Sequence, residues 1–523
     1  MAKYVARRLI HGFCSVVVVI AIIMLLVYGL LDKSLIFGSD DNFTQLSNNQ
    51  RQVYKYRMWE QYGYLDYVTY ADYLNELLSE GEIDEETYNA VVTVGRTAED
   101  DTEEISIYVE QFKEYYESQG YTVERLDAVL STGNRLATGG SQQYFAYRNK
   151  PLVTRLVSFF TSLLNFDSVN YATGDVGERG LTFTLYDPAY GGEKFSPAII
   201  GNGTLHKYLL YFDSNFPFIH QNFVTLTLGK SYSINYGVDV FTTMTQKQGS
   251  YVISTTYYPT GLVEDSADDM HSAIYVEGSL ELNLVYADRY TDDYTSVNTV
   301  KGAMSKIAFS FVIGIFSSIL SYAVGLPLGI LMAYKKDTWI DQLGNAYIIF
   351  MIAVPSLAYV FMFKAISGKL GLPTNFVLDS DTAYMFVTAI LSSGISSIGG
   401  QMKWMRRYMV DQMNSNYVKF ARSCGLSEGK IYTKHIFKNA AIPVMHGIPG
   451  TFVMALSGSI IVESVYVIPG IGGLLVQAIG AYDNSVVVGV ALFYGILQII
   501  SSVLGDVLMA VMDPRISFTS KAR

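Results

Sequence analysis

Six long stretches of the chain are rich in apolar residues, contain no Asp, Glu, Lys or Arg, and are each bounded by a charged residue. They cover residues 9–31, 307–334, 342–363, 382–402, 439–462 and 484–505. A transmembrane helix needs about 20 such residues, so each stretch predicts one membrane span. The first stretch follows Lys3, Arg7 and Arg8, as a signal peptide would, but it is too long and no small-residue cleavage site follows it. We therefore expect it to be a retained span.

A seventh uncharged stretch, residues 464–482, contains Pro469 and several glycines, which argue against a regular spanning helix. The distribution of positive charge decides between six spans and seven. With six spans, the ends and loops on one side carry sixteen Lys and Arg residues, and the short flanks on the other side carry four. This pattern predicts six spans with both termini in the cytoplasm. Residues 464–482 then form a re-entrant or surface-lying segment on the outer side.

The long segment between the first two spans has a different pattern. Its first half has apolar residues at three- and four-residue spacing, which predicts helices within residues 47–63, 69–81, 84–95 and 103–120. Its second half has β-branched and aromatic stretches between turn residues, which predicts strands within residues 181–187, 206–212, 222–229, 250–258 and 280–287. We expect three parts: residues 1–31 with the first span, an α+β extracellular domain at 32–303, and a membrane core at 304–523 with the other five spans.

Charge divides the chain in the same way. Residues 32–300 hold 38 acidic and 17 basic residues, whereas the rest of the chain holds 10 acidic and 20 basic residues. An acidic water-facing domain and a basic membrane part therefore share one chain. The two cysteines, Cys14 and Cys424, predict neither a disulfide framework nor a metal site.

The motifs of common catalytic sites are missing from the sequence. The nearest approach to a phosphate-binding loop, LGKS at residues 228–231, has Val224 where the motif needs its first glycine. The interiors of the spans also lack the carboxylates and basic side chains that ion-coupled transporters use. We therefore expect that the chain is not an enzyme and has no cofactor or metal of its own. The pattern favours an external energy source, and a passive channel stays compatible with it.

The loop between the fourth and fifth spans, residues 403–438, is basic and predicted to be cytoplasmic. Within it, Tyr417, Ala421 and Gly425 fall at i, i+4 and i+8, on one face of a helix, where small residues would let a partner approach closely. Gly425 can take the positive φ of a turn, and Ser427 could cap a second helix. Pro443 is expected in the first turn of the following span or at a kink in it. An ordinary basic loop between two spans is the alternative.

Residues 421–443, ARSCGLSEGKIYTKHIFKNAAIP, resemble the cytoplasmic coupling motif of bacterial ABC importer permeases, and of their oligopeptide/dipeptide branch in particular. The matching positions are Ala421, Gly425, Ile442 and Pro443. Residues 463–475 and 505–516 resemble the outer loop and C-terminal signature of that branch. Residues 206–232 are similar to the streptococcal Ami/Opp-type oligopeptide permeases, which carry a comparable extracellular insertion. Two departures are Thr227 and Lys419, where the family has acidic residues.

The resemblance implies the type I ABC importer permease fold and a role in moving oligopeptides into a bacterial cell through the plasma membrane. It implies several partners: a second homologous permease, two cytoplasmic ATPases that bind ATP and Mg, a lipid-anchored extracellular peptide-binding protein and the peptide itself, but no nucleic acid. The implied ATPase-coupling residues are Tyr417, Phe420, Ala421, Gly425, Leu426, Ser427 and Pro443. The extracellular domain is expected to dock the peptide-binding protein. The alternatives are a membrane-anchored sensor or adhesion protein, and a passive channel or secondary transporter.

Overall fold

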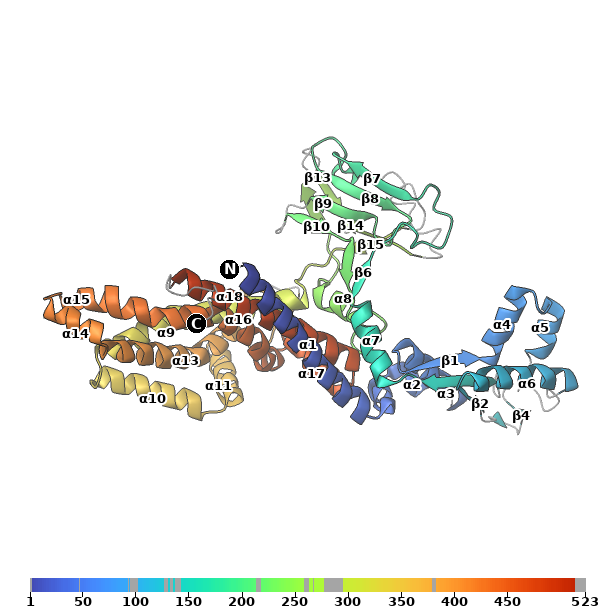
Figure 1. Cartoon of the computed structure of the whole chain (residues 1–523), viewed down its shortest axis with the longest axis horizontal. Coiled ribbons are helices and arrows are strands. Elements are labelled where there is room, and N and C mark those ends of the chain that lie inside the picture. Colours follow the sequence, from blue (N-terminus) through green and yellow to red (C-terminus); the bar gives the residue numbers. More distant parts are fainter. Residues whose placement is uncertain are drawn as a thin grey trace.

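The structure is a computed structural model, and it describes residues 2–46, 48–92, 94, 102–126, 130–131, 135–136, 143–212, 218–257, 263–266, 268–276, 295–378 and 382–512. It is elongated, with a bundle of long helices at one end and two separate lobes toward the other (Figure 1). One lobe is mainly helical and the other is built from strands. Both lobes come from the segment between the first and second long helices of the bundle.

The bundle consists of long apolar helices and shorter ones packed beside them. Its helices are α1 (Ala2–Leu30), α9 (Lys306–Tyr334), α10 (Trp339–Ala353), α11 (Ser356–Lys369), α12 (Thr382–Met385), α13 (Val387–Met413), α16 (Phe437–Tyr466), α17 (Ile471–Gly480) and α18 (Asn484–Met512). Many of their large apolar side chains are exposed in the single chain, as lipid-facing helices require. Within the described residues, four helices are long and apolar enough to cross a membrane, and the number rises to six if each of two bent pairs counts as one span.

The predicted third span, residues 342–363, is not one continuous helix. Helices α10 and α11 are bent by 106° at Val354 and Pro355. Proline has no N–H to donate, and it disfavours the helical conformation of the residue before it, so Val354 adopts an extended backbone and α10 ends. The prediction of a straight span is therefore wrong at this position.

A second bend separates α16 from α17, within the stretch predicted to be re-entrant or surface-lying. Residues Ile460–Tyr466 and Ile471–Gly480 meet at 83°, and Val467 between them has a left-handed φ of 58°. Pro469 and Gly470 lie in this bend, where a continuous helix would lose backbone hydrogen bonds. The short helix α17 packs against α9, α16 and α18.

The first lobe follows α1 and contains the predicted helices. Its elements are η1 (Lys33–Ser39), α2 (Asp41–Gln45), α3 (Asn48–Gln61), β1 (Leu65–Thr69), α4 (Tyr70–Glu80), α5 (Glu85–Val91), α6 (Glu103–Ser118), β2 (Thr122–Arg125), β3 (Leu130–Ser131), β4 (Arg135–Leu136) and β5 (Tyr144–Asn149). The strands β1, β5 and β2 form an antiparallel sheet in that order. Thr69 and Asp72 form a reciprocal capping box at the start of α4, and Gly81 ends the helix in a left-handed conformation.

The second lobe is strand-rich, as predicted. It contains α7 (Leu152–Ser162), β6 (Leu164–Phe166), β7 (Gly180–Thr184), η2 (Pro188–Tyr190), β8 (Ala198–Asn202), β9 (Tyr208–Phe212), β10 (Ile219–Gln221), β11 (Val224–Leu226), α8 (Val240–Thr245), β12 (Ser254–Tyr257), β13 (Val263–Ser266), β14 (Asp268–Tyr275) and β15 (Thr295–Thr299). The main sheet has the antiparallel order β10-β9-β8-β7. The strand predicted within residues 280–287 lies outside the described residues.

A buried carboxylate joins the lobes to the bundle. Asp483, directly before α18, accepts hydrogen bonds from the Ser231 hydroxyl at 2.7 Å and from the backbone N–H groups of Tyr232 and Ser233 at 2.7 and 3.1 Å. Next to it, the Asn484 side chain donates to the Tyr64 hydroxyl at 2.8 Å. The loop that superficially resembles a phosphate site therefore binds a carboxylate of the same chain.

Candidate coupling site

The predicted coupling segment lies at the end of the bundle farthest from the two lobes (Figure 1). It comprises α14 (Asn416–Ser423), α15 (Glu428–Lys430) and the π-helix η4 (Ile431–Ile436), which runs directly into α16.

The described parts of the N- and C-terminal helices meet each other in the bundle. The Tyr4 hydroxyl donates to Asp506 at 2.9 Å, and Arg8 forms an ion pair with the same carboxylate at 3.0 Å.

The segment is held to the bundle by a compact apolar cluster. Its buried members come from α9, α13, α14, η4 and α16, and they are Ala333, Met405, Met409, Val418, Ala421, Ile431, Ile436, Ala440 and Val444. Because these side chains come from five elements, movement of α14 must displace at least one of the long helices. Dense packing of this kind transmits displacement rather than absorbing it.

Ala421 does not lie on a surface open to a partner, as the row of residues Tyr417, Ala421 and Gly425 had predicted. Its side chain is 6% exposed and faces the apolar cluster, together with Val418. Tyr417 is half-buried, and its hydroxyl donates to Gln412 at 2.6 Å. The prediction that this face receives a partner is therefore wrong at Ala421: the small side chain lets α14 lie close to its own bundle.

Gly425 forms the predicted turn. Its φ is +77°, and the backbone N–H groups of Gly425 and Leu426 donate to the carbonyls of Arg422 and Ala421 at 2.9 and 3.2 Å. This pair of bonds is a Schellman motif, which satisfies helix carbonyls that would otherwise have no partner. A Cβ at Gly425 would meet no atom within 4 Å, so the requirement for glycine here comes from the backbone conformation alone.

Ser427 occupies the N-cap position of α15 with an extended backbone, but its side chain makes no capping hydrogen bond. The predicted position of Ser427 at the start of the second helix is therefore confirmed, but the capping hydrogen bond is not formed. The turn is closed instead by the Arg422 guanidinium, which donates to both Glu428 carboxylate oxygens at 2.7 and 3.2 Å. The hydrogen bond from Arg422 lowers the pKa of the Glu428 carboxyl. Because both side chains are exposed, this pair fixes geometry more than it adds stability.

Pro443 was predicted either in the first turn of the following span or at a kink in it. It is the seventh residue of α16, so it lies beyond the first turn. It cannot donate a backbone hydrogen bond to the preceding turn. The π-helix η4 precedes it, and π-helical turns often mark functional sites. The helical path from α15 into α16 is therefore irregular at two places in succession.

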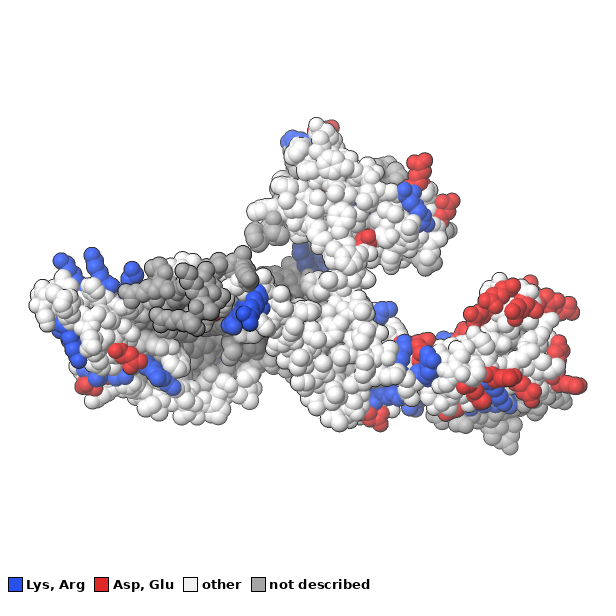
Figure 2. All heavy atoms as spheres, viewed as in Figure 1, with Lys and Arg blue, Asp and Glu red and all other residues white. Residues whose placement is uncertain are grey.

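The outward surface of the segment consists of apolar side chains surrounded by positive charge. Phe420 is 71% exposed and Leu426 is 38% exposed. Lys419, Arg422 and Lys430 of the same segment are also exposed, and blue side chains gather at this end of the molecule in Figure 2. An exposed aromatic anchor with a charged rim is the usual anatomy of a protein-binding patch. Among the described residues, no group of His, Cys, Asp and Glu side chains could hold a metal ion.

Two carboxylates make contacts within the bundle that were not predicted from the sequence. Arg406 of α13 contacts Asp341 of α10 with both hydrogen bonds at 2.6 Å. Glu463 of α16 is fully buried and accepts hydrogen bonds from the Ser310 hydroxyl at 2.7 Å and the Gly473 N–H at 2.9 Å. In the sequence, Asp341 and Glu463 each lie at the boundary of an uncharged stretch. This position marks them as charged residues next to a span, but it does not identify the residues that they contact.

Glu463 also explains the glycine at the start of α17. A Cβ on Gly470 would overlap the Glu463 carboxylate and the Ser310 hydroxyl. The Ser310 hydroxyl in turn accepts a hydrogen bond from the Ile471 N–H at 2.8 Å. The bend between α16 and α17 is therefore built around this carboxylate.

Several long apolar helices and two lobes outside the helical bundle define a polytopic membrane protein. The family described as "Binding-protein-dependent transport system inner membrane component" matches residues 325–518. Oligopeptide transport system permease protein AmiC of Streptococcus pneumoniae serotype 4 is 32% identical over 528 residues, covering 100% of this chain and 99% of AmiC. A putative peptide transport system permease protein of Brucella suis biovar 1 is 32% identical over 224 residues, covering 40% of this chain and 71% of that protein. The chain belongs to this family of ABC importer permeases, in its oligopeptide branch.

Among solved structures, an amino acid ABC transporter crystallised with histidines aligns with a TM-score of 0.33 and 15% identity, covering 40% of this chain and 92% of that chain. Family membership establishes a multi-pass protein of the cell membrane that works with ATPase and binding-protein partners. The sensor, adhesion, channel and secondary-transporter alternatives find no support in these comparisons.

Proposed function

We propose that this chain is the permease subunit of an ATP-driven importer of oligopeptides, and that it forms half of the translocation pathway. The single observation that carries the coupling assignment is the exposed Phe420 on α14, at the end of the bundle. The full-length similarity to an oligopeptide permease supports the substrate class. The other half of the pathway would come from a second homologous permease. Two ATPases that bind ATP and Mg and a lipid-anchored peptide-binding protein complete the complex.

In this proposal, the membrane contains six spans: the bent pair α10 and α11 forms the third, α16 forms the fifth, and α17 belongs to the re-entrant or surface-lying segment on the outer side. The coupling segment and both termini are cytoplasmic, and residues 32–303 are extracellular. The excess of Lys and Arg at the coupling end supports this orientation. The acidic lobes at the other end agree with it.

The mechanism follows from how α14 is attached. Phe420 and Leu426 enter a groove on one ATPase, while the opposite face of α14 stays in the cluster with Met409 and Ile436. When ATP binding closes the two ATPases, the force on Phe420 is transmitted through this cluster to α9, α13 and α16. These helices then tilt and expose the pathway to the other side. The role of Ala421 is to fix α14 to the bundle rather than to contact the ATPase.

The substitution Phe420→Ala tests this assignment. It removes the exposed anchor without touching the buried cluster, so we expect normal membrane insertion and at least about a tenfold loss of ATPase copurification and peptide uptake. The matched control is Trp339→Ala, since Trp339 is 72% exposed and starts the bundle helix α10 instead. Normal uptake by Phe420→Ala, or equal losses in both variants, would contradict the coupling assignment.

A further inference from the structure

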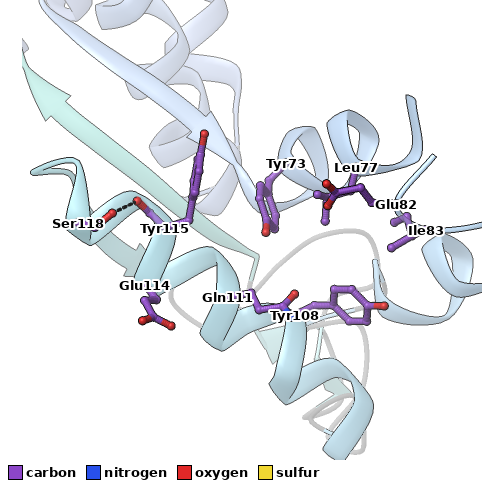
Figure 3. A pocket seen from close by; sticks show the side chains of 9 residues that line it. All are labelled: Tyr73, Leu77, Glu82, Ile83, Tyr108, Gln111, Glu114, Tyr115 and Ser118. Carbon is purple, nitrogen blue, oxygen red and sulfur yellow. Dashed lines mark hydrogen bonds between the residues drawn. The ribbon is translucent and has the colours of Figure 1, made fainter. Parts of the chain in front are cut away.

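A groove opens between α4 and α6 in the helical lobe, at the end of the molecule opposite the coupling segment (Figures 1 and 3). Its volume is about 560 Å³. Three tyrosines line it, Tyr73 from α4 and Tyr108 and Tyr115 from α6, together with the apolar side chains of Leu77 and Ile83. The groove is thus a hollow with aromatic walls on a water-exposed lobe.

The walls are held in place by the core beneath them. The ring of Phe112 on α6 packs against Tyr70 and Tyr73 of α4, with centroids 5.7 and 5.5 Å apart. Tyr70 and Phe112 are fully buried, so the spacing of the two helices is fixed. Tyr115 is 50% exposed, and its ring lies 6.0 Å from that of Tyr73. A preformed aromatic site loses little conformational freedom when it binds a ligand.

The charge around the groove is strongly negative. Residues 70–120 hold fifteen acidic and two basic residues, and this lobe is red in Figure 2. In Figure 3 the Glu82 carboxylate points toward Tyr73, whereas Glu114, also a lining residue, points away from α4. Neither glutamate forms an ion pair with another described residue. Lys113, the basic residue of this stretch that the structure describes, lies over the ring of Tyr144 at 4.8 Å.

Tyrosine faces beside a carboxylate are suited to a cationic side chain. The ring attracts the cation through its quadrupole, and the carboxylate accepts a charge-assisted hydrogen bond from it. The partner is therefore expected to present lysine or arginine. The position of the groove at the outer end, away from the bundle, suits a protein that stands above the pathway rather than a peptide inside it.

We propose that this groove binds a lysine or arginine on an exposed segment of the lipid-anchored peptide-binding protein. The inference rests on the proposed function, because that function supplies the partner. It assigns to the α4–α6 lobe the task of holding the peptide-loaded protein near the entrance. The aromatic walls provide the contact, and the surrounding acidic surface attracts the partner and orients its approach.

The test is the affinity of the purified peptide-binding protein for the complete permease–ATPase complex in lipid nanodiscs. The groove variant Glu82→Lys/Glu114→Lys is compared with Glu110→Lys/Glu117→Lys, which makes the same change of charge on exposed α6 positions outside the groove. We expect the groove variant to weaken binding at least about tenfold and the control less than about threefold. Equal effects of the two variants, or no effect of either, would overturn the proposal.

A second variant separates the aromatic contact from the charge. Tyr115→Ala removes a half-exposed ring without changing charge, and we expect it to weaken binding about threefold to tenfold. Unchanged binding by Tyr115→Ala would contradict the aromatic part of the site. Trilysine peptide is titrated alone in parallel. One outcome would assign the groove to the peptide substrate and overturn the proposed partner. In that outcome, the unmodified complex binds trilysine saturably and the groove variant does not, while the groove variant still binds the peptide-binding protein.

Peptide uptake by the unmodified complex distinguishes failure of the proposed function from failure of the proposed groove. No uptake by the unmodified complex would contradict the proposed function. Normal uptake together with equal binding by the groove and control variants would contradict the groove alone.

Discussion

At the coupling end a phenylalanine projects from a basic surface, whereas at the outer end tyrosines line a groove in an acidic surface (Figure 2). The coupling segment is attached through apolar packing against three long helices. The lobes are attached to the bundle through buried polar contacts at Asp483 and Asn484. A second apolar cluster adds to this attachment, because Leu228, Val240 and Met244 pack with residues of α1, α17 and α18. One chain therefore carries a basic segment packed on its long helices and, at the far end, an acidic lobe built from a separate segment.

The largest expected effect concerns the attachment of the lobes. Asp483→Ala leaves the Ser231 hydroxyl and two backbone N–H groups without their acceptor, and each orphaned buried group costs about 1–3 kcal/mol. We expect a loss of hydrogen-exchange protection in residues 228–235 and in the first turn of α18. Asp483→Asn, which keeps an acceptor oxygen, should lose much less. Equal protection in Asp483→Ala and the unmodified chain would show that other contacts hold the lobes.

The second prediction concerns the turn at the coupling end. Gly425→Val places a branched side chain at a φ of +77°, which costs about 1–2 kcal/mol or more. Because α14 is then displaced, we expect peptide uptake to fall about tenfold while the lobes keep their exchange protection. Gly425→Asn is the matched control, since asparagine tolerates this conformation and should retain most of the uptake. If Val and Asn behaved alike, the turn would not govern coupling.

The third prediction separates the two surfaces by their response to salt. Raising NaCl from about 0.05 to 0.5 M shortens the screening length to a few ångströms. Binding of the peptide-binding protein to the acidic groove should therefore weaken severalfold. Docking of the ATPase on Phe420 should weaken less than this, because the central contact is apolar and only the surrounding residues are charged. Copurification of the ATPase and the affinity of the peptide-binding protein, measured on the same preparation, check both expectations. A larger salt effect on ATPase docking than on binding at the groove would contradict the assignment of the surfaces.

The smallest expected effect is a pH dependence within the strand lobe. Burial raises the pKa of Asp167, but hydrogen bonds from His206 and from the Leu205 N–H outweigh it and hold the pKa below the usual value. A carboxyl with a lowered pKa stabilises the folded state above the unfolded pKa of about 4, and this contribution is lost as the pH falls further. Exchange protection of the Leu205 and His206 amides should therefore decrease below about pH 4. Asp167→Asn should show no such step.

Much of the bundle was predictable because its signals are local. Uncharged apolar stretches located α1, α9, α13 and α18, and the left-handed turn at Gly425 followed from the conformational freedom of glycine. Helices α3, α4, α5 and α6 and strands β9, β11 and β12 lie within segments predicted from their residue patterns, and strand β7 overlaps one. The sheet β1-β5-β2 of the first lobe was not predicted. The bend at Pro355 also had a local signal in the proline itself. It was missed because hydropathy alone was used to define that span.

The candidate site was predicted as a segment but not as a surface. The sequence placed Tyr417, Ala421 and Gly425 on one helical face, yet a helical face has no direction until its neighbours are known. The cluster around Met405 and Ile436 turns Ala421 inward and leaves Phe420 outside. Phe420, one of the seven coupling residues that the resemblance implied, is therefore the member that the structure leaves exposed, whereas Ala421 is buried.

The sequence by itself determined where the chain is apolar, where it must turn and how charge divides along it, because each of these depends on residues that are close in the chain. Only the tertiary structure decided which side of α14 is exposed, how Glu463 and Asp483 are satisfied, and that α4 and α6 enclose a groove. These features depend on residues from distant segments meeting in space. Burial, hydrogen-bond partners and cavities exist only after that meeting has taken place.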